Sequence, residues 1–117
     1  MSAAPRLTVA LLAVPESTAS TLHGMYDLFM SAGRDWDFLT RGVPGEQMIR
    51  PVVVSADGKR FRAVTGLPIE PDCALADCPP ADIIAVPDLL VAPNEDIGGR
   101  YVAECEWLKA RYAGGAT

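Results

Sequence analysis

Three short apolar segments separated by amphipathic stretches form the main pattern of this chain. Residues 7–14 (LTVALLAV) are almost continuously apolar, and residues 48–55 and 81–87 have the same character. Short continuous apolar runs are typical of strands buried on both faces, as in parallel sheets. Pro15-Glu16 follows the first run without a small-residue cleavage site, so we interpret the run as a strand and not as a signal peptide.

Two amphipathic segments alternate with these strands and predict helices. In the first, Leu22, Tyr26 and Phe29 recur at helical spacing after a cluster of Ser and Thr residues suited to an N-cap, and Gly33 is a suitable stop. The second covers residues 100–112 and ends before two glycines. Its apolar positions are expected on one helical face, as core or as a dimer surface: Tyr101, Val102, Cys105, Leu108 and Tyr112, with Trp107 beside them.

The connections between these elements carry weaker signals. Residues 36–47 contain the segment Gly-Val-Pro-Gly and predict a loop or a short helix before the second strand. Residues 61–71 alternate weakly around Gly66 and predict a small hairpin or edge strands, because prolines keep this piece out of a sheet centre. Asp96 is the expected N-cap of the last helix.

Strands that alternate with helices predict a doubly wound α/β domain, flavodoxin-like, with a mainly parallel sheet and helices on both faces. In such sheets ligands bind beyond the carboxyl ends of the strands. The residues that follow the first and third strands are therefore the candidate contacts for a small ligand. They are Glu16 and Ser17 after the first strand, and Asp88 and Leu89 after the third.

Composition narrows the class of protein. The 117 residues carry 10 Lys and Arg against 15 Asp and Glu, a net charge of −5, which argues against nucleic-acid binding by this chain itself. Three cysteines are too few for a disulfide framework and lack the spacing of a zinc site, so we expect reduced thiols, a cytoplasmic protein, and neither metal nor cofactor. No run approaches the roughly 20 apolar residues of a membrane span.

The order of several motifs resembles a known family. These are a buried strand ending in Pro15, a helix with Gly24 that ends at Ala32-Gly33, and the segments VVVSADG (52–58), GLPIEPD (66–72), Asp77 and DIIAVP (82–87). In this order they resemble the amino-terminal half of the ThiJ/PfpI superfamily, whose domain is class I glutamine amidotransferase-like. The chain is most similar to the branch that is fused to an AraC-type helix-turn-helix domain.

The resemblance also shows which catalytic elements this chain lacks. Enzymes of the superfamily use a cysteine on a strand-to-helix elbow, and residues 114–117 look like the lead-in to that strand; Cys73, Cys78 and Cys105 match none of the elbow positions. The acid that enzymes carry early in the first helix corresponds to Thr21. Their Pro-Gly-Gly loop, where backbone N–H groups approach an oxyanion, corresponds here to residues 87–89 (PDL), which add a negative charge.

The resemblance therefore implies that residues 1–117 are part of the ligand-sensing and dimerisation domain of an AraC-type regulator, without catalytic residues. A small-molecule effector and a homodimer are the expected partners, and DNA contact is expected outside this segment. A truncated cysteine hydrolase or amidotransferase-like enzyme is one alternative. A phosphoacceptor receiver domain is another alternative, with Asp88 at a strand end as the phosphoacceptor. Such a domain binds magnesium with a pair of acids after the first strand, and this chain has a single acid there, Glu16. A sheet without its next strand also predicts an oligomeric or partly molten isolated chain.

Overall fold

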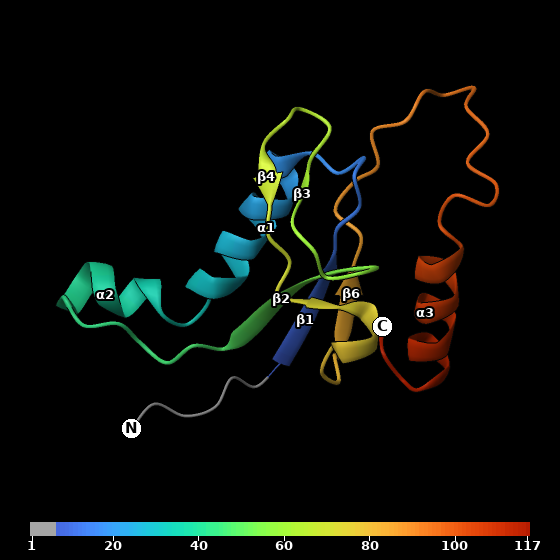
Figure 1. Cartoon of the computed structure of the whole chain (residues 1–117). Helices are drawn as coiled ribbons and strands as arrows, with labels where there is room; N and C mark the ends of the chain where they lie inside the picture. Colours follow the sequence, from blue (N-terminus) through green and yellow to red (C-terminus); the bar gives the residue numbers. More distant parts are fainter. Residues whose placement is uncertain (1–6) are drawn as a thin grey trace.

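Four parallel strands form the centre of residues 7–117, the part of the chain that the computed structural model describes (Figure 1). The strands lie in the order β5-β2-β1-β6, which confirms the predicted mainly parallel α/β fold. The elements are β1 (Leu7–Leu12), α1 (Ala19–Ser31), α2 (Asp35–Arg41), β2 (Ile49–Ser55), β3 (Phe61–Arg62), β4 (Pro68–Ile69), β5 (Cys73–Ala74), the 3-10 turn η1 (Leu75–Asp77), β6 (Ile83–Ala85) and α3 (Val102–Ala113).

The first apolar run becomes the central strand β1. It pairs with β2 along its whole length, from Leu7 opposite Ile49 to Leu12 opposite Val54, and with β6 on its other side. Its residues Val9 to Leu12 are all apolar and buried because both faces are covered, with α1 packed on one face and α3 on the other (Figure 1).

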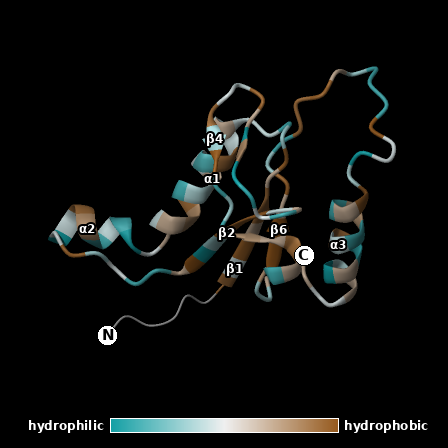
Figure 2. Cartoon of the chain, in the orientation of Figure 1, coloured by the Kyte–Doolittle hydropathy of each residue, from teal (hydrophilic) through white to brown (hydrophobic). Residues whose placement is uncertain are grey.

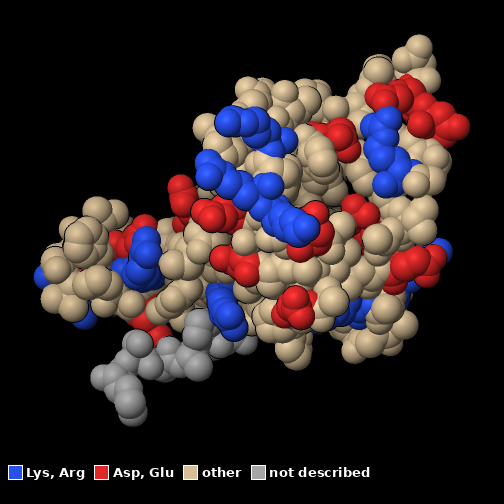
Figure 3. Space-filling view, in the orientation of Figure 1, with Lys and Arg blue, Asp and Glu red and all other residues tan. Residues whose placement is uncertain are grey.

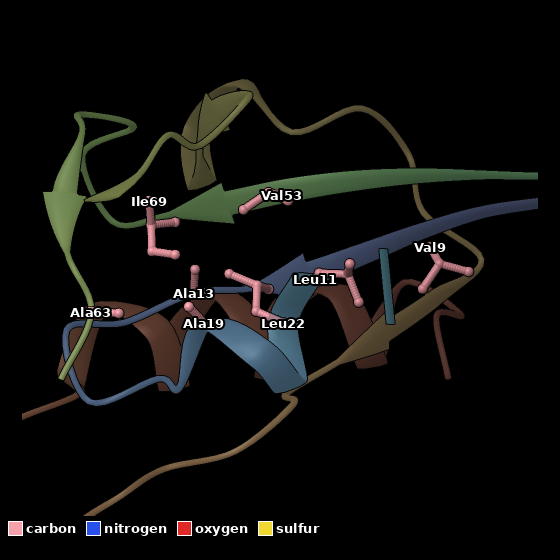
Figure 4. Packing of buried hydrophobic residues seen from close by; sticks show 8 residues of the cluster. All are labelled: Val9, Leu11, Ala13, Ala19, Leu22, Val53, Ala63 and Ile69. Atoms are coloured by element: carbon pink, nitrogen blue, oxygen red, sulfur yellow. The ribbon is translucent and has the colours of Figure 1, made fainter. Parts of the chain in front are cut away.

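Alternation along the strands divides the core into two clusters, one on each face of the sheet. Figure 4 shows the cluster on the α1 face, where hydrophobic side chains from β1, α1, β2 and the hairpin meet. It contains Val9, Leu11, Ala13, Ala19, Leu22, Val53, Ala63 and Ile69. The second cluster contains Ala10, Leu12, Val52, Val54, Leu75 and Cys78, against which Trp107 and Leu108 of α3 pack. Figure 2 shows the corresponding hydrophobic colour on the central strands.

The predicted hairpin at residues 61–71 is confirmed and lies over the start of α1. Strands β3 and β4 pair antiparallel, with Phe61 opposite Ile69, and form a sheet of their own. The backbone N–H of Val64 donates to the carbonyl of Ser17 at 3.3 Å, which ties the hairpin to the turn after β1. The short helix α2 begins at Asp35 and occupies the first part of the segment at residues 36–47, which is one of the two alternatives that the sequence predicted.

The last helix differs from the sequence prediction in its inner face and in its N-cap. A core role for Val102, Cys105 and Tyr112 is wrong, and a dimer surface on this side of the helix stays a prediction. Val102, Cys105 and Tyr112 are exposed, and the residues that pack on the sheet are Trp107 and Leu108. Apolar residues occupy more than one side of this helix, so periodicity alone could not choose the inner face.

Asp96 does not cap α3, because the helix starts at Val102 with Tyr101 at the N-cap position. The Asp96 carboxylate instead accepts a hydrogen bond from the N–H of Gly98 at 2.8 Å, which closes a local turn.

The last described residue makes backbone hydrogen bonds with the edge of β6 that faces away from β1. Thr117 donates its N–H to the carbonyl of Asp82 at 3.0 Å, and its carbonyl accepts from Ile84 at 2.8 Å. This is the pairing pattern of a parallel strand. Among residues 7–117, no helix combines the length and the apolar character needed to cross a bilayer.

Candidate functional site

The carboxyl ends of β1 and β6 lie side by side, because these two parallel strands are neighbours in the sheet. The chain continues from β1 to β2 on one side of β1 and later to β6 on the other side. The carboxyl ends of β1 and β6 therefore flank the point where the strand order reverses. Ligands of open α/β sheets bind at this kind of position. Glu16, Ser17, Asp88 and Leu89 all follow these two strand ends, as the sequence predicted.

The Asp88 carboxylate lies at the start of α1. Its Oδ1 accepts from the backbone N–H of Thr18 at 3.1 Å, and its Oδ2 accepts from the Thr18 hydroxyl at 2.7 Å. The Thr18 hydroxyl also lies 2.9 Å from that of Thr21. Thr18 is the N-cap residue of α1, but its side chain makes no cap hydrogen bond because Asp88 and Thr21 engage it. A carboxylate here is favoured by the partial positive charge of the helix N-terminus.

Glu16 joins the turn after β1 to the segment that leads into α3. Its Oε1 accepts a hydrogen bond of 2.5 Å from the hydroxyl of Tyr101, and its carbonyl accepts from the N–H of Leu90 at 2.9 Å. Burial raises the pKa of the Tyr101 phenol above its usual range, and the hydrogen bond to Glu16 raises it further, while Arg100 opposes the shift. The two acids thus hold residues 88–101 against the turn after β1.

The other two predicted ligand contacts differ in accessibility. Ser17 is fully buried, and its hydroxyl accepts from the N–H of Val14 at 3.1 Å, so it shapes the turn after β1 from within. Leu89 is exposed beside Asp88. The structure therefore brings all four residues to one end of the sheet, and direct contact with a ligand stays a prediction for each of them.

An open groove that sequence reasoning missed borders the Thr18–Asp88 contact. It has a volume of about 780 Å³ and lies between the first residues of α1 and the β3–β4 hairpin. Its lining includes three residues with hydroxyl groups, together with a basic residue and an apolar one: Thr18, Ser20, Thr65, Arg62 and Leu67. Figure 3 shows Lys and Arg side chains over the hairpin on this face. The basic cluster at residues 59–62 was a sequence signal, but nothing local linked it to the start of α1.

Each of the three thiols lies in a different part of the fold. Cys73 is in β5 and half-buried, Cys78 is buried behind η1, and Cys105 is exposed on α3. Burial raises the pKa of the Cys78 thiol, with Arg111 opposing it, and burial likewise raises the pKa of Cys73. A raised pKa disfavours the thiolate that a nucleophile requires. Within residues 7–117, no three His, Cys, Asp or Glu side chains gather in a way that could hold a metal ion.

Comparison with known proteins supports the α/β fold. No protein-family model matches the sequence, and a search of the curated proteins finds no match. A crystal structure described as that of "a putative transcriptional regulator protein from Vibrio parahaemolyticus" is similar, with a TM-score of 0.68 and 15% sequence identity. The match covers 95% of this chain and 53% of the other, so the chain spans about half the length of that protein. At this identity the likeness shows a shared α/β fold.

Proposed function

We propose that this chain is part of the ligand-sensing and dimerisation domain of an AraC-type transcriptional regulator, and that it is not catalytic. The similarity in fold to a protein described as a transcriptional regulator supports this proposal, as does the ordered resemblance to the regulator branch of the ThiJ/PfpI superfamily. The net charge of −5 is consistent with DNA contact by another part of such a protein.

The observation that carries the proposal is the arrangement of Asp88, Thr18 and Thr21. Where the resembled enzymes place an acid beside a nucleophile and an anion-binding loop, this chain has the Thr18 hydroxyl, which donates to the Asp88 carboxylate and is hydrogen-bonded to the hydroxyl of Thr21. Asp88 would repel a developing oxyanion, and Thr21 cannot act as an acid or base near neutral pH. The same contacts suit a site that holds two segments together and releases them when a ligand competes.

In this proposal an effector binds at the shared strand end, near Glu16, Asp88 and Leu89 with Ser17 behind them, and extends into the neighbouring groove. Groups on the effector that replace Tyr101 on Glu16, or Thr18 on Asp88, would weaken the hold on residues 88–101. Because this segment leads directly into α3, a bound effector would shift the position of that helix. The shift is limited by the difference in effector affinity between the held and released states.

Hydrolase and thiol chemistry can be tested directly. We expect the full chain to hydrolyse a chromogenic ester no faster than the triple variant C73S/C78S/C105S, in which every thiol is removed. Turnover that depends on a cysteine would refute the non-catalytic assignment. In the gene that encodes this chain, a helix-turn-helix segment is expected; a cysteine elbow without such a segment would favour the enzyme alternative.

A further inference from the structure

Cys73 and Cys78 come from different elements but enter the same part of the core. Cys73 lies in β5, and Cys78 follows the 3-10 turn η1, where its N–H donates to the carbonyl of Leu75 at 3.3 Å. Cys78 belongs to the buried cluster on the α3 face of the sheet, and Cys73 packs against this cluster. The turn η1 therefore returns the chain to the cluster that it leaves at Cys73.

The two thiols also act on one another directly. Burial raises the pKa of Cys73, and the neighbouring charge of the Cys78 thiolate raises it further. Burial likewise raises the pKa of Cys78, while Arg111 and a hydrogen bond from the Cys73 side chain oppose the rise. A hydrogen bond between two thiols requires neighbouring sulfur atoms, which is also the first requirement for a disulfide.

The two thiols differ in their access to solvent. Cys73 is half-buried, so a small reagent can reach its sulfur from outside. Cys78 exposes only 7% of its surface, and its thiol donates to the carbonyl of Pro79 at 3.3 Å. The guanidinium of Arg111 donates to the carbonyl of Cys78 at 2.7 Å, and a positive charge at this position favours the thiolate of Cys78. Cys73 is therefore suited to meet a reagent from solution, and Cys78 to react with Cys73 from within.

We propose that Cys73 and Cys78 form a reversible disulfide by exchange with a low-molecular-weight disulfide. The Cys73 thiolate attacks one sulfur of the reagent, the S–S bond of the reagent breaks, and its first thiolate leaves. The Cys78 thiolate then attacks the Cys73 sulfur of the mixed disulfide, so the internal S–S bond forms and the second thiolate leaves. The two protons lost by Cys73 and Cys78 protonate the two leaving thiolates. The protein dithiol is oxidised, and the reagent is reduced to two thiols.

This disulfide joins the short strand β5 to the turn on which α3 rests. Cys78 is part of that turn: its carbonyl accepts from Arg111, and Trp107 and Leu108 of α3 pack against the cluster that contains it. Linkage makes the effect reciprocal, because the factor by which the folded chain favours the disulfide is the factor by which the disulfide favours folding. The inference goes beyond the proposed function and does not depend on it.

The test equilibrates the full chain, as the C105S variant without the exposed thiol, in mixtures of glutathione and glutathione disulfide. Acid stops the exchange, the remaining thiols are alkylated, and intact mass spectrometry counts them. The closed form takes up no alkyl group and is lighter than the dithiol by about 2 Da, the mass of the two hydrogens lost. We expect the equilibrium constant for closure to be at least about tenfold larger in the folded chain than in the same chain unfolded in urea.

Urea unfolding gives a second, independent measurement. The oxidised C105S chain should unfold with an equilibrium constant smaller by the same factor, and the matched control C73A/C78A/C105S should unfold identically in oxidising and reducing buffer. The comparison with the unfolded chain is decisive because two cysteines this close in sequence can also pair without a fold. Equal closure constants in the folded and unfolded chain, glutathione adducts that accumulate without closure, or disulfide-linked dimers on a non-reducing gel would each overturn the inference.

Discussion

Asp88→Ala removes the acceptor of two hydrogen bonds that join residues far apart in the sequence. Both bonds go to Thr18, 70 positions away, at 3.1 Å from its N–H and 2.7 Å from its hydroxyl. A hydrogen bond to a charged group contributes about 1.5–3 kcal/mol, and a carboxylate at a helix N-terminus adds about 0.3–1 kcal/mol. Because the site is only partly buried, we take the lower end and expect Asp88→Ala to cost about 2 kcal/mol of unfolding free energy.

Asp88→Asn keeps one acceptor oxygen and loses the charge, so it should cost about half as much. Equilibrium urea unfolding followed by circular dichroism measures both losses; with a slope of about 2 kcal/mol/M, Asp88→Ala lowers the midpoint by about 1 M. Asp96→Ala is the matched control, since this exposed acid accepts a single local hydrogen bond from Gly98. We expect it to change stability by less than about 0.5 kcal/mol.

A double-mutant cycle separates the contact from other effects of Asp88. Thr18→Val removes the hydroxyl donor, and the coupling between the two substitutions should be about 1 kcal/mol. If Asp88→Ala were as stable as the wild type, or if the two changes were additive, the contact would not be what holds residues 88–101 in place.

Three further predictions concern titration, backbone conformation and thiols. Burial and Glu16 raise the pKa of Tyr101, so the phenol of Tyr101 should titrate above pH 10 when absorbance is followed at 295 nm, and Glu16→Gln should lower the midpoint of this titration. The stability that Tyr101 contributes is present below pH 10 and is lost as pH rises through the pKa of Tyr101 in the folded protein. Gly58→Ala should destabilise the protein more than Gly66→Ala. Both glycines have a positive φ, which costs an alanine about 1 kcal/mol or more. A Cβ at Gly58 would in addition lie 2.6 Å from a backbone nitrogen of β5, whereas a Cβ at Gly66 would meet open space. Equal losses in thermal melts would contradict this. Alkylation followed by mass spectrometry should modify the exposed Cys105 first, because burial raises the pKa of the other two thiols.

The central strands were predictable because continuous runs of apolar residues indicate strands that are buried on both faces. A run such as residues 52–54, three valines in succession, is stable only where both faces of a strand are covered, and the structure divides these side chains between two clusters. Strand β5 was not predictable, since Cys73 and Ala74 form no apolar run and become a strand only through pairing with Val54 and Ser55.

The orientation of α3 could not be read from its periodicity. Apolar residues occupy more than one side of the helix, and contacts with a distant turn select the inner side. Arg111 donates to the carbonyls of Cys78 and Pro79 at 2.7 and 3.1 Å and lies 5.3 Å from the centre of the Trp107 ring. These contacts turn Trp107 and Leu108 toward the sheet and leave Tyr112 outside.

The sequence by itself determined the class of fold, the end of the sheet where Glu16, Ser17, Asp88 and Leu89 lie, and the net charge of −5. These features follow from the local residue pattern and the composition, which do not depend on the tertiary packing of the chain. Only the tertiary structure decided that Glu16 meets Tyr101, that Asp88 meets Thr18, and that α2 stands free. Such contacts join positions 70 and 85 residues apart, and their geometry is set by the packing of whole elements on the sheet.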